Sequence, residues 1–189
     1  MDFNEHSGFS YDDYLKLEEL RSGTIRLLTD IDEFSAEGLL TEIAYLARHK
    51  YLEITIIMSS PGGDAYHAFA MYDAIRALCK TGTEVTILVE GMAASAAAMI
   101  ILQAASKRQA RPNARLLLHE VRRWVFAMER KSDVQDEYRE MEAVTDQIVQ
   151  ILSERCQKDP TEVKKLIERK EVWMSAQEAL AWGLIDSVT

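Results

Sequence analysis

The sequence predicts an α/β domain in which parallel strands are joined by crossover helices. Short runs of β-branched and aliphatic residues alternate with longer segments whose apolar residues recur with the helical period. The chain has 189 residues, of which 48% are apolar, enough for one sizeable core. No low-complexity tract, repeat or Pro/Gly/Ser-rich linker divides it. We therefore expect residues 1–21 to form an N-terminal appendage and residues 22–189 to form one domain.

The first half of the chain holds three predicted strands and three predicted helices. The strands are runs rich in isoleucine, valine and threonine: 24–28, 53–58 and 84–89. The helices have one apolar face or, in the last case, many small residues: 35–49, 64–78 and 93–105. The second strand ends at Ser60-Pro61-Gly62-Gly63, a sequence typical of turns, and Gly91 is expected to end the third.

The second half contains a short strand, a long helix and two capped helices. Residues 115–118 form an apolar strand that ends at His119, and residues 132–156 form a long polar helix. In Asp159-Pro160-Thr161-Glu162, aspartate is the N-cap and proline takes the first helical position. Ser175-Ala176-Gln177-Glu178 is a capping box, and Gly183 ends the helix that it begins. We expect strands and helices to alternate to the end of the chain.

Charge and composition disfavour several classes of function. The net charge of −9 disfavours a nucleic-acid surface, which needs clustered lysine and arginine. Cys79 and Cys156 lack the spacing of a metal site, so we expect reduced thiols. Residues 1–10 lack the basic and apolar regions of a signal peptide, and the longest apolar run, 92–105, is too short to cross a bilayer. We expect a cytoplasmic protein that binds neither nucleic acid nor membrane.

Two glycine-containing segments are candidates for the chemistry of a site. The pair Gly62-Gly63 follows a strand and precedes a helix, where backbone N–H groups can point at an anion or an oxyanion. The alternative is a tight strand-to-helix turn with no further role. Ser95 is expected just inside the helix that follows Gly91, near the positive end of the helix dipole. The alternative is a small residue that fills a helix–helix contact.

His119 is the best candidate for a general base. A base must be held within hydrogen-bond reach of its serine, and the tip of a core strand would hold it rigidly. The alternative is a histidine satisfied within the core or at its rim. His6, His49 and His67 are weaker candidates, in the tail, at a helix end and on the helix after the glycine pair. The order of glycine pair, serine and histidine, each at the end of an α/β unit, is more specific than any one of them.

Four segments together resemble the Clp protease proteolytic subunit (ClpP) family. They are Ser60-Pro61-Gly62-Gly63, Gly91-Met92-Ala93-Ala94-Ser95, Leu118-His119, and Trp173-Met174-Ser175-Ala176-Gln177-Glu178-Ala179 with the following Gly183-Leu184-Ile185-Asp186. The resemblance covers residues 22–189. Residues 60–65 and 91–98 also resemble the phage prohead-type branch of the same superfamily. The resemblance implies a ClpP/crotonase-like spiral of repeated ββα units with a long helix after the catalytic histidine.

The same resemblance implies roles for four residues. Ser95 would attack the scissile carbonyl of a peptide, with His119 taking its proton and later giving it to the leaving amine. The backbone N–H groups of Gly63 and Ala96 match the oxyanion-hole positions of the family. The chain would therefore be a serine peptidase.

The third member of the triad departs from the family pattern. The family has an aspartate three residues before the Met-Ser-Ala run, and this chain has Glu171 there. A glutamate can orient an imidazole and stabilise its charged form, although its extra methylene changes the reach. Glu171 could instead be a surface carboxylate that begins a strand. Glu120 and Asp146 are alternative orienting acids.

The family resemblance also implies an assembly. It predicts an ATP-dependent-type endopeptidase that cleaves unfolded polypeptide inside a chamber made by two stacked seven-membered rings. It further implies an AAA+ unfoldase as partner and no cofactor. The predicted helix 132–156 would contact the opposite ring, or alternatively pack only on its own domain.

Three departures concern the substrate groove and the assembly. The Gly-rich strand that follows the histidine in the family is replaced by residues 120–130, which are charged and aromatic. In the family, an Asp-Arg pair just before the catalytic acid is linked to ring assembly. This chain has Arg169-Lys170 at that position. The N-terminal segment lacks the usual pore-loop sequence of the family.

Two other functions remain open from the sequence. An inert ring subunit that assembles or regulates active relatives would explain the altered acid and groove, but it would not need both Ser95 and His119. A crotonase-type acyl-CoA enzyme would share the spiral architecture and the oxyanion hole, and would use acidic residues near the thioester instead of a serine–histidine pair.

Overall fold

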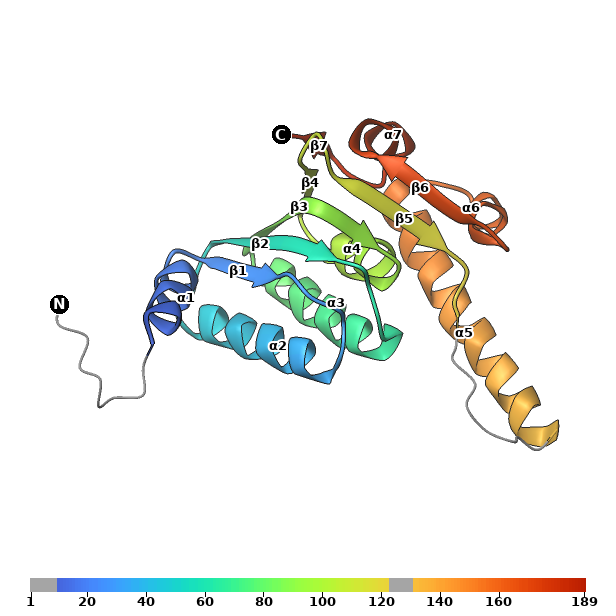
Figure 1. The fold of residues 1–189 in the computed structure, drawn as a ribbon, viewed down its shortest axis with the longest axis horizontal. Helices are drawn as coiled ribbons and strands as arrows, with labels where there is room; N and C mark the ends of the chain where they lie inside the picture. The colour runs from blue at the N-terminus through green and yellow to red at the C-terminus, as the bar shows by residue number, and fades with distance from the viewer. Residues whose placement is uncertain (1–9, 123–130) are drawn as a thin grey trace.

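A computed structural model of the chain describes residues 10–122 and 131–189 as a mixed α/β fold (Figure 1). Its first half contains α1 (Tyr11–Arg21), β1 (Thr24–Leu27), α2 (Glu33–Arg48), β2 (Glu53–Ser60), α3 (Ala65–Lys80) and β3 (Glu84–Ala94). Its second half contains the π-helix η1 (Ala97–Ile101), α4 (Leu102–Ala104), β4 (Lys107–Ala110), β5 (Arg115–His119), α5 (Lys131–Cys156), α6 (Pro160–Ile167), β6 (Glu171–Ser175), α7 (Ala176–Trp182) and β7 (Ser187–Val188).

The seven strands of the described residues form one sheet. Its main path is β1-β2-β3-β4-β7, and β5 lies beside β3 with β6 on its other edge. Helices α2 and α3 cover one face of β1, β2 and β3, while α5 runs past the end of β5 (Figure 1). The predicted α/β class is confirmed, and most strand pairs are parallel as expected.

One pair of strands departs from the expectation of parallel strands. β5 and β6 are antiparallel, with His119 directly opposite Glu171 and Arg115 opposite Ser175. The chain returns after α5 and α6 in the reverse direction, so that β6 covers the edge of β5. This pairing brings the predicted base and the predicted acid of the site onto one pair of strands.

The expectation that Gly91 ends the third strand is wrong. β3 continues through Gly91 to Ala94 and changes its partner on the way. Its first part pairs with β4, from Thr86 to Val89, and its last part pairs with β5, from Met92 to Ala94. Gly91 has φ +77°, a conformation that glycine adopts without steric cost, so the strand can bend there and go on.

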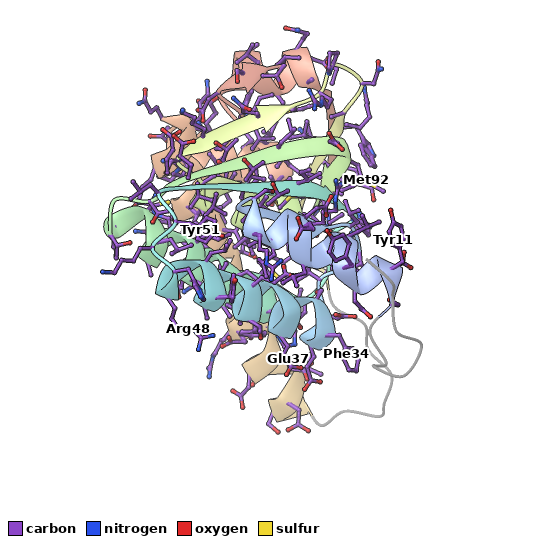
Figure 2. The ribbon with its side chains drawn as sticks, turned by 90° about the vertical axis from the view of Figure 1, so that its left-hand side faces the viewer. Tyr11, Phe34, Glu37, Arg48, Tyr51 and Met92 are labelled. Atoms are coloured by element: carbon purple, nitrogen blue, oxygen red, sulfur yellow. The ribbon has the colours of Figure 1, made fainter. Side chains whose placement is uncertain are left out.

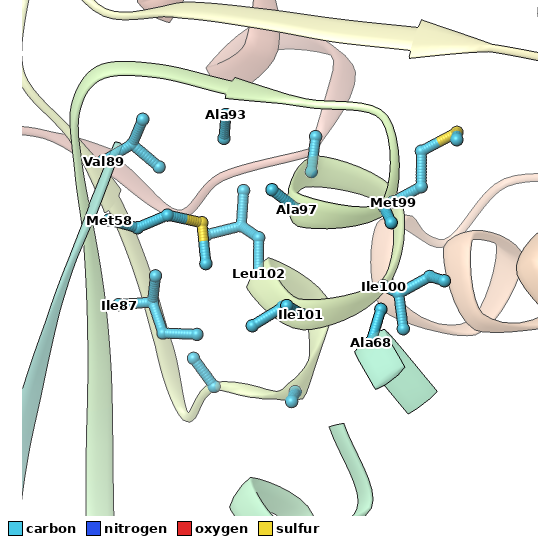
Figure 3. Close-up of a cluster of buried hydrophobic side chains, with 14 of the residues drawn as sticks. Met58, Ala68, Ile87, Val89, Ala93, Ala97, Met99, Ile100, Ile101 and Leu102 are labelled. Atoms are coloured by element: carbon cyan, nitrogen blue, oxygen red, sulfur yellow. The ribbon is translucent and has the colours of Figure 1, made fainter. Parts of the chain in front are cut away.

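The helix expected over residues 93–105 begins later than predicted. Ala93 and Ala94 belong to β3, Ser95 lies in the turn after it, and the helical segment starts at Ala97. The segment η1–α4 is buried throughout and packs between the sheet and α3 (Figure 3). Small side chains permit this close packing, and in the core cluster Ile100, Ile101 and Leu102 of this segment are joined by Met58, Ala68, Ile87 and Val89.

The capped helices of the C-terminal half are confirmed. The Asp159 side chain accepts a hydrogen bond from the N–H of Thr161, with Pro160 at the first position of α6. Ser175 and Glu178 form both bonds of the capping box of α7. Gly183 ends α7 in a left-handed conformation, φ +89°, as the sequence predicts.

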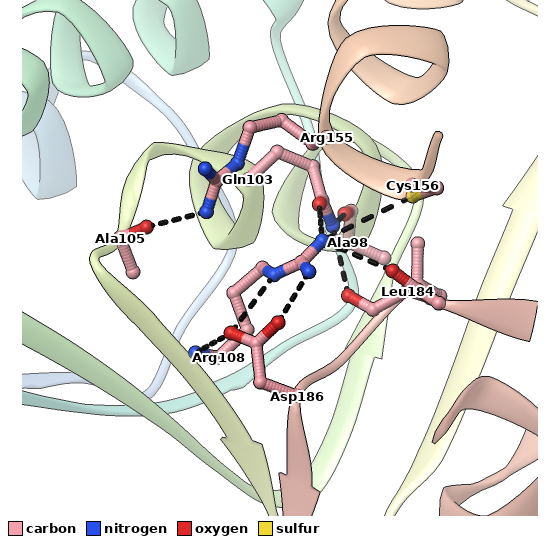
Figure 4. A network of polar contacts seen from close by, with 9 residues as sticks. Ala98, Gln103, Ala105, Arg108, Arg155, Cys156, Leu184 and Asp186 are labelled. Carbon is pink, nitrogen blue, oxygen red and sulfur yellow. Dashed lines mark hydrogen bonds and ion pairs between the residues drawn. The ribbon is translucent and has the colours of Figure 1, made fainter. Parts of the chain in front are cut away.

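The predicted alternation of strands and helices fails at β4, which is followed by β5 without a helix between them. β4 is held by a buried polar network around Arg108 (Figure 4). Its guanidinium pairs with Asp186, donates to the Gln103 side chain at 2.8 Å, and donates to the Gly183 carbonyl at 3.1 Å. Arg155 donates to the Ala105 carbonyl at 2.7 Å nearby. Polar bonds thus join β4, α4, α5 and the C-terminal segment.

Helix α1, from the segment expected to be an appendage, is bonded to the sheet. Arg26 on β1 makes a bidentate ion pair with Glu19, and the Tyr51 hydroxyl donates to the Arg21 carbonyl at 2.8 Å. Phe34, at the start of α2, projects away from the sheet and is 80% exposed (Figure 2). Across residues 10–122 and 131–189, no helix has both the length and the apolar character needed to traverse a bilayer.

Candidate active site

Ser95 lies in the turn between β3 and η1, outside the helix in which it was expected. Its φ of +56° falls in the left-handed region, which a serine adopts only at a cost in strain. Hydrogen bonds hold it there: its N–H donates to the Leu117 carbonyl at 2.9 Å, and its carbonyl accepts from the N–H of Met99 at 2.9 Å. A strand, a strained serine and a helix in succession present a hydroxyl at the end of a sheet. The Ser95 side chain is only partly buried.

His119 ends β5, the strand to which the Ser95 turn is bonded. Ala94 and Leu117 are partners in the parallel register of β3 and β5, so Ser95 and His119 emerge at the same end of neighbouring strands. Both residues line one cavity of about 310 Å³. The described residues contain no hydrogen bond between the two side chains, and such bonds are often long before substrate binds.

The imidazole of His119 has a defined hydrogen-bond partner. Its Nδ1 lies against the backbone carbonyl oxygen of Glu120. A carbonyl oxygen can only accept, so Nδ1 carries the proton and Nε2 keeps its lone pair. This is the tautomer that a general base requires, and here the main chain selects it.

The glycine pair packs directly against the serine turn. A Cβ at Gly62 would lie 2.5 Å from the Ala94 carbonyl oxygen and 2.6 Å from Ser95 Cβ. A Cβ at Gly63 would lie 2.2 Å from the carbonyl oxygen of Ile31, whose N–H and carbonyl are bonded to this loop. Glycine is therefore required at both positions for steric reasons. The segment is a tight strand-to-helix turn, and it also packs beside the proposed nucleophile, so the two interpretations left open by the sequence are compatible.

Two backbone N–H groups are available at the cavity. Gly63 and Ala96 both line it, together with Ser95. Within the described part of the chain, neither N–H donates a hydrogen bond to a protein group. A pair of unengaged amides beside a nucleophile can hold the negative oxygen of a tetrahedral intermediate.

Glu171 lies beside His119 but bonds to another residue. Directly opposed residues of antiparallel strands point to the same face of the sheet, so the two side chains share a face. The Glu171 carboxylate accepts a hydrogen bond from Arg122 Nη2 at 2.6 Å. It makes no hydrogen bond to the imidazole among the described residues.

The two alternative acids are engaged elsewhere. The Glu120 side chain accepts from the backbone N–H of Arg169 at 3.1 Å. Asp146 accepts from Lys164 at 3.2 Å on the exposed side of α5 and α6. Among the described residues, neither carboxylate makes a hydrogen bond to the His119 ring, so Glu171 remains the candidate acid by position.

The cavity has an apolar wall and a charged rim. The wall consists of Met99 from η1 with Met141, Val144 and Ile148 from α5, and the rim includes the carboxylates of Asp64, Glu137 and Glu140. The Tyr66 hydroxyl donates to Glu140 at 2.7 Å and joins α3 to α5 at the cavity. Nothing in the local sequence signals this link, because the two residues are 74 positions apart.

The described residues contain no candidate set of metal ligands. Across residues 10–122 and 131–189, no three His, Cys, Asp or Glu side chains are grouped so that they could hold a metal ion. Cys79 and Cys156 are free thiols, and burial raises the pKa of Cys156.

The structure thus brings Ser95, His119, Gly63 and Ala96 to one cavity, with Glu171 on the adjacent strand. Neither the strained backbone of Ser95 nor the bond between Arg122 and Glu171 was predicted from the sequence. A strand followed by a serine and a helix could have signalled the strained serine turn. Most of the segment that replaces the Gly-rich strand, residues 123–130, lies outside the described residues.

Comparison with known proteins gives consistent matches over nearly the whole chain. The family described as Clp protease matches residues 5–189. An ATP-dependent Clp protease proteolytic subunit from Porphyromonas gingivalis is 31% identical over 167 residues, 87% of this chain and 72% of the relative. The proteolytic subunit 1 from Tropheryma whipplei is 30% identical over 190 residues, 98% of this chain and 89% of the relative.

Proposed function

The chain belongs to the Clp protease family, and from this premise we propose that it is a serine endopeptidase with Ser95 as nucleophile and His119 as general base. One observation carries the proposal: the turn of Ser95 is bonded to the strand that ends at His119, and both residues line one cavity with the amides of Gly63 and Ala96. The name of the family is that of a protease, and this arrangement supports the proposed serine mechanism.

The proposed mechanism uses these groups in sequence. The Ser95 hydroxyl oxygen attacks the scissile carbonyl carbon while Nε2 of His119 accepts the hydroxyl proton. The N–H groups of Gly63 and Ala96 stabilise the negative oxygen of the tetrahedral intermediate. The C–N bond breaks as His119 returns the proton to the leaving amine, which leaves an acyl ester on Ser95. Water, deprotonated by the same ring, then hydrolyses the ester.

Glu171 is the proposed third member of the triad. A carboxylate beside the imidazole would stabilise its positive charge during both steps. Its register opposite His119 supports the role. Substitution of Glu171 by glutamine is expected to slow hydrolysis, by less than the loss of Ser95 does.

The substrate and the assembly are proposed from the family to which the chain belongs. The matched relatives carry the name of proteolytic subunits of an ATP-dependent protease. The proposal is that this chain cleaves unfolded polypeptide inside a cytoplasmic homo-oligomer of stacked heptameric rings, served by an AAA+ unfoldase. Exposed Val134 and Tyr138 on α5 support a contact of that helix with another subunit.

A fluorophosphonate probe tests the mechanism, because it bonds covalently to an activated serine. Labelling is expected in the wild type and in Ser153→Ala, whose hydroxyl is buried outside the cavity. Labelling and peptide hydrolysis are expected to be lost in Ser95→Ala and His119→Ala, with hydrolysis falling about 10³-fold or more. An assembled wild type that is not labelled would instead support an inert ring subunit.

A thermal-shift titration with acyl-CoA separates the crotonase-type alternative. We expect no change in melting temperature, because a peptidase site has no reason to bind the thioester or the nucleotide. A concentration-dependent rise in melting temperature, together with absence of probe labelling, would overturn the peptidase proposal.

A further inference from the structure

We propose that Arg122 is a positioning residue that controls the acid of this site: its ion pair with Glu171 holds the carboxylate away from His119. The inference rests on the proposed function and names a form of regulation of the same site. Arg122 lines the cavity that contains Ser95 and His119. It is 49 positions from Glu171 in the sequence, and the pairing of β5 with β6 brings the two together.

Glu171 is within reach of two competing partners. Directly opposed residues of antiparallel strands have Cβ atoms about 4.5–5.5 Å apart, so the register places the carboxylate close enough to bond to the His119 ring. The structure instead bonds it to Arg122 Nη2 at 2.6 Å. The imidazole Nδ1, where the acid of a triad would bind, is occupied by the Glu120 carbonyl.

The charges of the partners explain which one Glu171 chooses at rest. A guanidinium always carries its charge, so it forms a stronger bond with a carboxylate than a neutral imidazole does. The preference for Arg122 weakens when the ring accepts the serine proton, because the imidazolium is then a second cation and its residue lies opposite Glu171 in the strand register. The ion pair with Arg122 therefore opposes the step in which Glu171 is needed.

The ion pair is weak enough to exchange. The side chains are 63% and 49% exposed, and an ion pair in solvent contributes little to stability. The site can therefore pass between a resting form, in which the main chain orients His119, and a competent form, in which Glu171 joins the ring. A contact that moves Arg122 would favour the competent form.

Other charged groups lie near the site. Those that line the cavity from the neighbouring elements are Asp64 before α3 and Glu137 and Glu140 on α5, and Glu120 lies next to the histidine. They are present in all variants compared below, so their effect cancels in a double-mutant cycle.

Peptidase kinetics test the competition. Arg122→Gln is expected to raise kcat about two- to five-fold with KM unchanged, the range set by a weak exposed ion pair. In the Glu171→Gln background the same substitution is expected to change nothing. Arg122→Lys keeps a cation and should gain less than Arg122→Gln. Arg48→Gln, on the exposed side of α2, is the matched control and should leave kcat as in the wild type.

Several kinetic outcomes would overturn the proposal. A fall in kcat in Arg122→Gln would mean that Arg122 helps the acid. A change confined to KM would mean that it binds substrate. An equal gain in Arg122→Gln with and without Glu171 would show that the carboxylate is not involved, and an equal gain in Arg122→Lys would show that charge is not the cause.

A spectroscopic readout separates this inference from the proposed function. In the full-length protein with ¹⁵N-labelled histidine, the Nδ1 signal of His119 is expected to shift in Arg122→Gln, because its acceptor changes from a carbonyl to a carboxylate. No shift is expected in the Arg122→Gln/Glu171→Gln double variant. An identical spectrum in wild type and Arg122→Gln would refute the competition. Absence of Ser95 labelling would instead refute the peptidase, whatever the spectrum shows.

Discussion

At the level of single residues, Gly62 decides how closely the loop after β2 approaches the proposed nucleophile. Its missing side chain leaves room for the Ala94 carbonyl and for Ser95 Cβ. Its φ of +91° lies in the left-handed region, so glycine is needed for the backbone as well as for the space. The strained Ser95 turn and the glycine loop therefore depend on each other.

Gly62→Ala tests this dependence. We expect the substitution to displace the serine turn, abolish probe labelling and destabilise the fold by more than the roughly 1–2 kcal/mol of a left-handed alanine alone. Gly82→Ala is the matched control, because Gly82 has φ +94° but no atom within 4 Å of a Cβ. Urea unfolding measures both free energies. Equal costs for the two variants would mean that the contact with Ser95 is unimportant.

At the level of elements, the ion pair between the buried Arg108 and the partly exposed Asp186 joins β4 to the segment between α7 and β7. Partial burial alone would raise the pKa of Asp186, but hydrogen bonds from the side chain and N–H of Arg108 outweigh it and lower the pKa. A carboxylate with a lowered pKa in the folded state stabilises the fold above its ordinary pKa. That contribution is lost as the pH falls through the lowered value.

Asp186→Asn is expected to reduce stability at pH 7 by about 2 kcal/mol, below the 3–5 kcal/mol typical of fully buried pairs, because the Asp186 side chain is 42% exposed. The difference from the wild type should shrink as the pH falls below about 4, because Asp186 is protonated there first in the unfolded chain, where its pKa is the ordinary one. Urea unfolding at pH 7 and pH 3 checks this. Asp136→Asn, from an exposed ion pair, should show little difference at either pH. A loss for Asp186→Asn that is the same at both pH values would contradict the assignment.

At the level of the whole molecule, α5 has both an internal and an external role. Its C-terminal half contributes Val144, Ile148 and Leu152 to the core. Its N-terminal half exposes Val134 and Tyr138, one turn apart on the same side of the helix. An apolar pair on a protruding helix is typical of an interface, and the proposed stacked rings would bury it.

Tyr138→Asp combined with Val134→Asp is expected to separate the stacked rings and halve the solution mass, because it places charge in an apolar contact. Light scattering measures the mass, with Phe34→Asp on α2 as a control that is also exposed and apolar in the wild type. If the mass of the α5 variant equals that of the wild type, α5 does not form the contact between rings.

The sequence by itself determined the features that depend on neighbouring residues. Apolar periodicity located the helices, and the capping residues Asp159 and Ser175 and the terminal glycine Gly183 marked their ends correctly, because these signals act within one helical turn. The motifs around Gly63, Ser95 and His119 were also recognisable, since each is a short segment at the end of a strand. Their gathering around one cavity was expected from the α/β order and is seen in the structure.

Only the tertiary structure decided the features that depend on distant segments. β4 is polar and β7 has two residues, so neither has a local signal, and both form because the sheet supplies hydrogen-bond partners. Whether β3 ends or bends at Gly91 depends on β5 being available as a new partner. Likewise, the residue type of Glu171 identifies an acid, but its bond to Arg122 depends on the pairing of β5 with β6, which only the fold provides.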